Sequence, residues 1–141
     1  MKAEHIDQVC EIESDSFSIP WTRRDFMKEL DNAKMCIYFV AVEGDEVLGY
    51  AGMWHVINEG HITNVAVKRE RRREGVGDAL IEALIKAGSL KEMAGLTLEV
   101  RIFNGIAQKL YRKHGFKTEG VRRRYYADTG EDAIIMWKIL G

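Results

Sequence analysis

The sequence predicts a single α/β domain over residues 1–141, with helices flanking a mixed, mostly antiparallel sheet. Three observations support this fold class. Helical and strand patterns follow one another as two helices, three strands, helix, strand, helix and two strands. The strand–helix–strand segment from Val65 to Arg101 requires a parallel crossover at the centre of the sheet. Only a short turn separates the last two strands, so they are expected to pair antiparallel.

Composition sets limits on the class of protein. Hydrophobic residues make up 46% of the chain, which allows one packed core, and the net charge of −1 gives no general attraction to nucleic acid. Two cysteines without a CxxC pair and four histidines without HExxH spacing predict no metal site. The N-terminus lacks the apolar core of a signal peptide, and no apolar run reaches the ~18–20 residues that span a bilayer. A cytoplasmic protein without a membrane partner is expected.

The first half of the chain predicts two helices and three strands. Residues 5–17 have apolar side chains at helical spacing, and an aromatic-rich turn around Pro20 follows. Thr22 is a natural N-cap for a second helix, in which Phe26 and Leu30 share a face. Strands are predicted for the β-branched and aromatic stretches 36–43, 47–57 and 61–67, with turns at 44–45 and 58–60.

The strongest helical pattern begins at Gly75. Apolar residues recur at i, i+3, i+4, i+7, i+8 and i+11, namely Val76, Ala79, Leu80, Ala83, Leu84 and Ala87. Gly88 is expected to end this helix.

The last third predicts a strand, a helix and a hairpin. In the strand at 96–101, apolar residues alternate with Thr97, Glu99 and Arg101. Asn104 is expected to cap the next helix, and Gly115 lies just past its end. Two closing strands are predicted near 116–127 and 132–140, around a turn at 128–132.

Positive charge and glycine come together directly before the central helix. The segment "KRERRREGVGD" starts at Lys68 and places Arg72 and Arg73 beside Gly75 and Gly77. The first turn of a helix exposes unpaired backbone N–H groups, and glycine lets an anion approach them. The pattern therefore favours a pyrophosphate site. It matches neither GxGxxG nor GxxxxGK[ST], and a solvated basic turn or a nucleic-acid patch also fits the spacing.

The same segment resembles the GNAT superfamily of N-acetyltransferases. Arg72-x-x-Gly75-x-Gly77 matches that family's R/Q-x-x-G-x-G/A signature, between the strand "NVAV" and an amphipathic helix. The stretches "SFSIPWT", "LEVRIFNGIAQKLYRKHGF" and "RRRYYADTGEDAIIM" resemble the bacterial ribosomal-protein-alanine N-acetyltransferases within it. Two features depart from the family pattern: the first helix begins almost at Met1 without a preceding strand, and Arg69 stands where many relatives have proline.

The resemblance implies acetyl-CoA as co-substrate and a set of residues that bind it. The strand backbone at Val65, Ala66 and Val67 would hold the pantetheine arm and polarise the acetyl carbonyl, and Asn104 would contact the same arm. The pyrophosphate would be bound by the turn residues, which are Arg72, Arg73, Glu74, Gly75, Val76, Gly77 and Asp78.

The resemblance also implies two catalytic side chains. Glu99, on the polar face of its strand, corresponds to the family's general base, and Tyr111 to its general acid, which would also contact the cofactor. Tyr111 follows Asn104 by seven residues, about two helical turns, so both side chains are expected on one face of the helix. An ordinary polar strand residue and a core tyrosine are the structural alternatives.

Physical chemistry limits the choice of acceptor amine. Lysine titrates ~2.6 units above a protein α-amino group, so its deprotonation at neutral pH costs roughly 3.5 kcal/mol more. This favours the N-terminus of a ribosomal protein. The groove for it is predicted between Trp21 and the segment containing Tyr125, Tyr126 and Asp128. The charge of Asp128, Glu131 or Asp132 could attract the amine. Lysine or small-amine acceptors, and a non-catalytic acyl-CoA-binding or RNA-binding module, remain alternatives.

Overall fold

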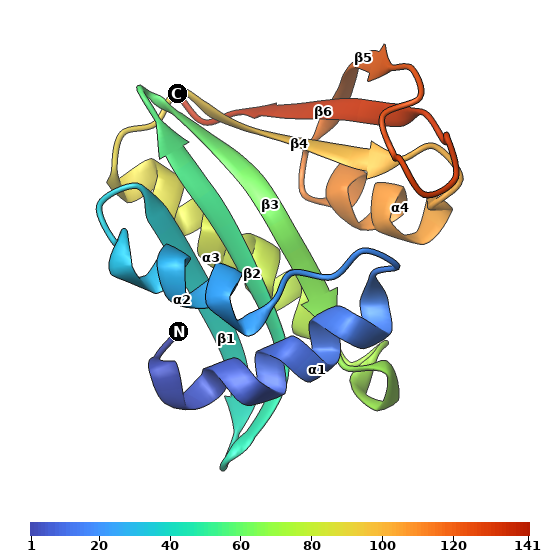
Figure 1. The fold of residues 1–141 in the computed structure, drawn as a ribbon. Coiled ribbons are helices and arrows are strands. Elements are labelled where there is room, and N and C mark those ends of the chain that lie inside the picture. Colours follow the sequence, from blue (N-terminus) through green and yellow to red (C-terminus); the bar gives the residue numbers. More distant parts are fainter.

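The computed structural model describes residues 1–141 and contains a six-stranded sheet with strand order β1-β2-β3-β4-β6-β5 (Figure 1). Its strands are β1 (Cys36–Glu43), β2 (Glu46–Val56), β3 (Glu59–Val67), β4 (Gly95–Arg101), β5 (Lys117–Arg122) and β6 (Ala133–Ile139). The helices are α1 (Ile6–Ser16), α2 (Arg23–Asp31), α3 (Val76–Leu90) and α4 (Gly105–Lys113), with short 3-10 turns at Ala3–His5 and Arg69–Arg71. None of the helices combines the length and apolar character that crossing a bilayer requires.

β3 and β4 form the only parallel pair in the sheet, as the crossover through α3 predicts. They are paired at three positions only, ending at His61 opposite Thr97. Beyond this point β3 stays paired with β2, and β4 stays paired with β6. The two strands diverge in the middle of the sheet (Figure 1). The remaining strand pairs are all antiparallel.

A β-bulge interrupts β3 just after the paired segment. Gly52 of β2 lies opposite Asn64 and Met53 opposite Ile62, so Thr63 is the extra residue. The bulge reverses the alternation of side chains. Ile62 packs in the core on the α3 side, whereas Ala66 packs in the core under α1 and α2. Asn64 therefore also faces α1.

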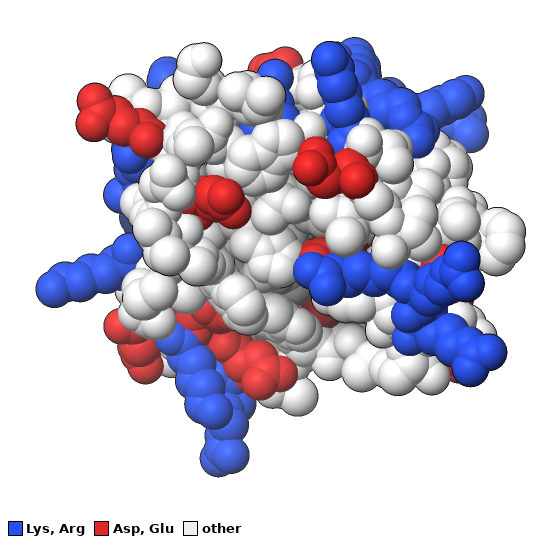
Figure 2. Space-filling model, turned by 90° about the horizontal axis from the view of Figure 1, so that it is seen from above, with Lys and Arg blue, Asp and Glu red and all other residues white.

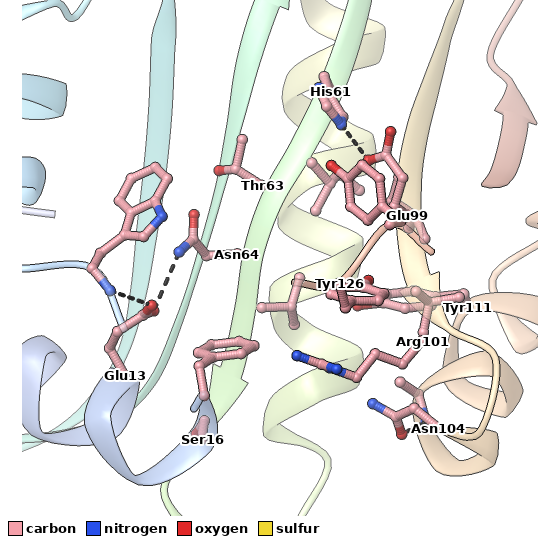
Figure 3. Close-up of a pocket in the computed structure, with 18 of the residues that line it drawn as sticks. Glu13, Ser16, His61, Thr63, Asn64, Glu99, Arg101, Asn104, Tyr111 and Tyr126 are labelled. Atoms are coloured by element: carbon pink, nitrogen blue, oxygen red, sulfur yellow. Dashed lines mark hydrogen bonds and ion pairs between the residues drawn. The ribbon is translucent and has the colours of Figure 1, made fainter. Parts of the chain in front are cut away.

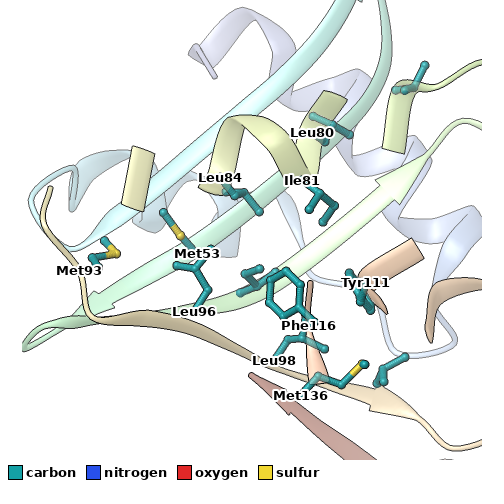
Figure 4. Close-up of a cluster of buried hydrophobic side chains, with 14 of the residues drawn as sticks. Met53, Leu80, Ile81, Leu84, Met93, Leu96, Leu98, Tyr111, Phe116 and Met136 are labelled. Atoms are coloured by element: carbon teal, nitrogen blue, oxygen red, sulfur yellow. The ribbon is translucent and has the colours of Figure 1, made fainter. Parts of the chain in front are cut away.

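Two apolar clusters cover the two faces of the sheet. The larger one lies between the sheet and α3, and Leu84, Leu96 and Phe116 are at most 1% exposed in it (Figure 4). The smaller one lies under α1 and α2, where the Phe26 ring packs edge-on against Tyr50 at a centroid distance of 5.7 Å. Thr22 caps α2 as predicted, because its side chain accepts a hydrogen bond from the Asp25 amide.

The prediction for α3 was wrong in two details. The helix continues to Leu90, and Gly88 is buried inside it, where an added Cβ would lie 2.8 Å from Leu140. Its buried face contains Ile81, while Ala79 is exposed. The bulkier side chains face the sheet because they bury more apolar surface there than alanines would.

Two strand boundaries also differ from the prediction. β5 ends at Arg122, so residues 123–132 form the loop to β6, here called the β5–β6 loop. The turn between β2 and β3 is formed by Ile57 and Asn58, and β3 begins at Glu59 instead of His61. Arg124 and Ile57 have φ angles of 52° and 56°, and such left-handed conformations end regular strands.

Candidate active site

A pocket of about 450 Å³ opens where β3 and β4 diverge (Figure 3). One wall comes from the end of α1 and from residues 17–22, here called the α1–α2 loop. The opposite wall comes from β4, α4 and the β5–β6 loop, and β3 lies between the two walls. The predicted site residues that line the pocket are Trp21, Val65, Glu99, Asn104, Tyr111, Tyr125 and Tyr126.

Glu99 is the carboxylate on the β4 side of this pocket. Its side chain is 11% exposed, and its Oε2 lies 2.7 Å from Nε2 of His61. Its Oε1 lies 3.3 Å from the Arg122 guanidinium. The hydrogen bond from His61, supported by the positive charge of Arg122, holds the pKa of Glu99 below its usual range despite partial burial. The strand therefore presents an ionised carboxylate to the pocket.

Tyr111 lies both in the apolar core and at the pocket. It is 9% exposed and packs on Phe116 with 5.9 Å between ring centroids, so it belongs to the core. It also lines the pocket from α4 (Figure 3). Burial raises the pKa of Tyr111 above its usual value, which keeps the phenol protonated.

Asn104 caps α4 as predicted. Its Oδ1 accepts a hydrogen bond of 3.1 Å from the Ala107 amide. The cap occupies the side-chain oxygen, and the amide nitrogen is the group with which Asn104 can donate into the pocket. Asn104 and Tyr111 both line the pocket, so the predicted shared helix face is confirmed.

The two predicted acceptor walls face each other, and one hydrogen bond connects them. Ser18 of the α1–α2 loop donates to Asp128 of the β5–β6 loop. Asp128 also pairs with Arg101 at 2.8 Å and does not line the pocket itself. The Ser18 hydroxyl and the Arg101 guanidinium lower the pKa of Asp128. Its charge is thus already engaged in holding the rim together.

Arg101 and Tyr126 lie together in the same wall of the pocket. The guanidinium carbon of Arg101 lies 4.0 Å from the centre of the Tyr126 ring, a cation–π contact. Tyr125 packs edge-on against Tyr126, with 5.1 Å between centroids. Burial raises the pKa of Tyr126 to about 12. These aromatic rings give the pocket apolar surface beside its ionised groups.

The glycine turn lies beyond the end of β3, at the start of α3. Gly75 is the N-cap of the helix with φ 84°, and it offers no side chain to the first-turn amides. Arg73 also has a left-handed backbone, with φ 67°. Left-handed residues in such a turn direct neighbouring N–H groups into one concavity that binds anions. The predicted residues from Arg72 to Gly77 are therefore together in one turn.

Some ionisable groups around the turn take part in ion pairs and others do not. Arg71 binds Glu43, Glu46 and Glu74, and this pairing directs the Glu74 charge toward Arg71. Asp78 pairs with His114 at 2.8 Å and Lys113 at 3.0 Å, which lowers the pKa of Asp78. Neither Arg72 nor Arg73 takes part in an ion pair, and Arg72 donates to the Val67 carbonyl at 3.3 Å. Their positive charge remains available to an anion.

Sequence reasoning missed three ionisable residues of the pocket: Glu13, His61 and Arg101. Arg101 lies two residues after Glu99 on the same strand face, which was a usable signal. Glu13 follows Val9 by one helical turn, and a carboxylate on the apolar face of a predicted helix was another. His61 had no local signal, because only the sheet register brings it next to Glu99.

Comparisons with known proteins identify the relatives of this chain. The model of the Acetyltransferase (GNAT) family matches residues 6–116. A Bacillus subtilis protein with a provisional name as a ribosomal protein bS18-alanine N-acetyltransferase is 42% identical over 137 residues, covering 97% of this chain and 91% of that protein. The Escherichia coli ribosomal protein bS18-alanine N-acetyltransferase is 34% identical over 127 residues, covering 89% and 84%. The crystal structure of the ribosomal-protein-S18-alanine N-acetyltransferase from Escherichia coli superposes with a TM-score of 0.90 at 30% identity, covering 100% of this chain and 91% of the other.

Proposed function

Because the chain belongs to the GNAT family of acetyltransferases, we propose that it transfers the acetyl group of acetyl-CoA to the N-terminal amine, alanine in the first instance, of a small-subunit ribosomal protein. The observation that carries this proposal is the pocket between the diverging strands. It contains an ionised carboxylate and a protonated phenol, and a glycine turn suited to an anion lies beyond the end of β3. The names of the similar proteins support the choice of acceptor.

The chain's own groups fit the parts of acetyl-CoA. The first-turn amides after Gly75, with Arg72 and Arg73, suit the pyrophosphate. The edge of β3 at Val65, Ala66 and Val67 faces the divergence, so its backbone groups suit an extended pantetheine arm, with Asn104 opposite. Acetyl-CoA supplies an activated thioester, and the β3 amides would donate to its carbonyl oxygen.

Glu99 is proposed as the general base. Its pKa is lowered, which makes it a weak acceptor for a proton from a free ammonium ion. It is better suited to receive the proton while the neutral amine attacks the carbonyl, because the nitrogen becomes more acidic as the bond forms. The lowered pKa of Glu99 therefore favours an α-amine over a lysine, because a weak base needs an acceptor that is already partly neutral near pH 7.

Tyr111 is proposed as the general acid. Its raised pKa lies further above that of a thiol than a free phenol's would, so full proton transfer to the departing sulfur is uphill. We expect Tyr111 to stabilise the developing thiolate through a hydrogen bond and to deliver the proton as the charge grows.

The direct test is acetyl transfer from acetyl-CoA to peptides, followed by mass spectrometry. A peptide beginning Ala-Arg is expected to gain one acetyl group at its N-terminus. The same peptide with a blocked N-terminus and an internal lysine, and free polyamines, serve as the other acceptors. Transfer to lysine or polyamines in preference to the free N-terminus would overturn the proposed acceptor.

Variants test the two catalytic assignments. Glu99→Gln is expected to lower kcat by about 10²-fold and to move the pH optimum upward, since more of the amine must then lose its proton without help. Tyr111→Phe is expected to slow single-turnover transfer while the Kd for acetyl-CoA stays unchanged. An unaltered pH–rate profile for the first variant, or a wild-type single-turnover rate for the second, would remove the assigned role.

The basic surface beside the pocket is consistent with an acidic partner. Lys and Arg side chains gather on the side of the molecule that carries β5 (right in Figure 2). The exposed run Arg122, Arg123 and Arg124 connects β5 to the β5–β6 loop at the edge of the site. We propose that this surface faces an acidic partner such as the ribosome. The group that the site binds is the N-terminus of the ribosomal protein, and no direct recognition of nucleic acid is proposed.

A further inference from the structure

Glu13 is a buried carboxylate that the proposed reaction does not use. It is 2% exposed and lines the pocket from α1, yet no Lys, Arg or His pairs with it. Its Oε1 accepts hydrogen bonds from the Tyr50 hydroxyl and, at 3.2 Å, from Nδ2 of Asn64. Its Oε2 accepts a hydrogen bond of 2.8 Å from the Trp21 backbone amide.

The buried carboxylate of Glu13 depends on its three donors. Removing a charged group from water is costly, and hydrogen bonds compensate for it only when the donors are held in place. An apolar side chain at this position would avoid that cost but would leave all three donors without an acceptor. Burial and the Glu13 carboxylate raise the pKa of Tyr50, so its hydroxyl keeps the proton that it donates. The Tyr50 hydroxyl, the Asn64 amide and the Trp21 backbone amide therefore all act as hydrogen-bond donors to Glu13.

Two of the three donors belong to parts that must be aligned for acyl transfer. Trp21 belongs to the α1–α2 loop, which forms the acceptor wall of the pocket. Asn64 directly follows the Thr63 bulge and precedes Val65, the start of the β3 edge proposed for the thioester. Tyr50 lies on β2, in the core below them. Figure 3 shows the hydrogen bond between Glu13 and Asn64.

We propose that Glu13 is a positioning residue that fixes the acceptor wall at Trp21 relative to the β3 bulge at Thr63 and Asn64, and so sets where the amine stands against the thioester. This inference rests on the proposed function. Glu13 does not contact the reacting atoms in this role. It acts through two hydrogen bonds, one from the Trp21 amide to Oε2 and one from Asn64 to Oε1.

Glu13→Gln separates the two connections. The glutamine carbonyl can serve the Tyr50 and Asn64 donors, but its NH₂ group then faces the Trp21 amide, another donor. The acceptor wall is expected to loosen, raising KM for the Ala-Arg peptide about tenfold while the Kd for acetyl-CoA stays within twofold. Tyr50→Phe is the matched control, since it removes one donor from Oε1 and leaves the bond to Trp21. Its KM for the peptide is expected to stay within twofold of wild type.

Hydrogen exchange of the Trp21 amide gives a second readout that needs no activity. It is expected to be about tenfold faster in Glu13→Gln than in wild type and unchanged in Tyr50→Phe. A wild-type KM in Glu13→Gln, or an equal rise in both variants, would overturn the positioning role. If the wild-type chain acetylates lysine instead of N-termini, the proposed function fails, while the same KM comparison with lysine still decides the role of Glu13.

Discussion

His61 and Glu99 are in hydrogen-bond contact, at 2.7 Å, although 38 residues separate them in the chain. The contact arises at the last paired position of β3 and β4, where His61 lies opposite Thr97 and Glu99 is two residues further along β4. Beyond this point β3 and β4 no longer pair with each other, and the pocket opens between them. The hydrogen bond from His61 therefore helps to keep Glu99, the proposed base, ionised where β3 and β4 begin to diverge.

The first prediction concerns the pKa of Glu99. His61→Ala removes the hydrogen bond that contributes most to lowering it, so the pKa of Glu99 is expected to rise. Arg122→Ala is expected to raise it less, since Arg122 contributes less. NMR titration of the Glu99 carboxyl carbon measures both. A larger rise in Arg122→Ala than in His61→Ala would contradict the assignment of His61 as the main partner.

The second prediction concerns stability against acid. The folded-state pKa of Glu99 lies below its unfolded value of about 4.3, so its stabilising effect is complete above that pH. The effect is lost as pH falls through the lower folded-state pKa. Urea unfolding from pH 3 to 7 is expected to show wild type more stable than Glu99→Gln near neutrality, with a shrinking difference below about pH 4. A constant difference over the whole range would show that the ionised carboxylate is not stabilising.

The third prediction concerns the glycine turn. Gly75→Trp is expected to abolish acetyl-CoA binding in calorimetry, because the side chain would cover the first-turn amides. Gly44→Trp is the matched control: both glycines have positive φ angles, 84° and 60°, and neither has another atom within 4 Å of an added Cβ. Both variants carry a similar backbone strain of roughly 1 kcal/mol. Loss of binding in both, or in neither, would contradict a pyrophosphate site at Gly75.

The fourth prediction concerns the core. Phe116 is 1% exposed between the sheet and α3, and Phe116→Ala is expected to lower the free energy of unfolding by about 3–5 kcal/mol. Phe103 is 86% exposed, and Phe103→Ala is expected to change it by no more than ~0.5 kcal/mol. Denaturant unfolding of the two variants checks the pair. Similar values for both would place Phe116 outside the cooperative core.

The sequence predicted the order of elements because each carries a local signal. Apolar alternation defined β4, Thr22 and Asn104 capped their helices as expected, and β5 and β6 pair antiparallel as predicted, although the loop between them is longer than the predicted turn. The errors lie where tertiary packing decides. Gly88 is a helix-ending residue by propensity, yet α3 continues past it because the residue is buried against Leu140 and Leu96.

The site was less predictable than the fold. The turn from Arg72 to Gly77 is continuous in sequence, so its residues were found together. The partners of Glu99 come from β3 and from the end of β5, and those of Glu13 come from β2, β3 and the α1–α2 loop. Such groups meet only through the sheet register and the Thr63 bulge, which hydrophobic periodicity does not encode.

The short pairing of β3 with β4 also has a thermodynamic consequence. Three aligned positions connect the two halves of the sheet, and beyond them the edges of β3 and β4 that face each other lack a strand partner. A ligand lying along both edges would act as a missing strand and would stabilise the native state by RT ln(1 + [L]/Kd). Melting temperature should therefore report coenzyme occupancy directly, and the resistance of this chain to proteolysis in a cell should follow the supply of its acyl donor.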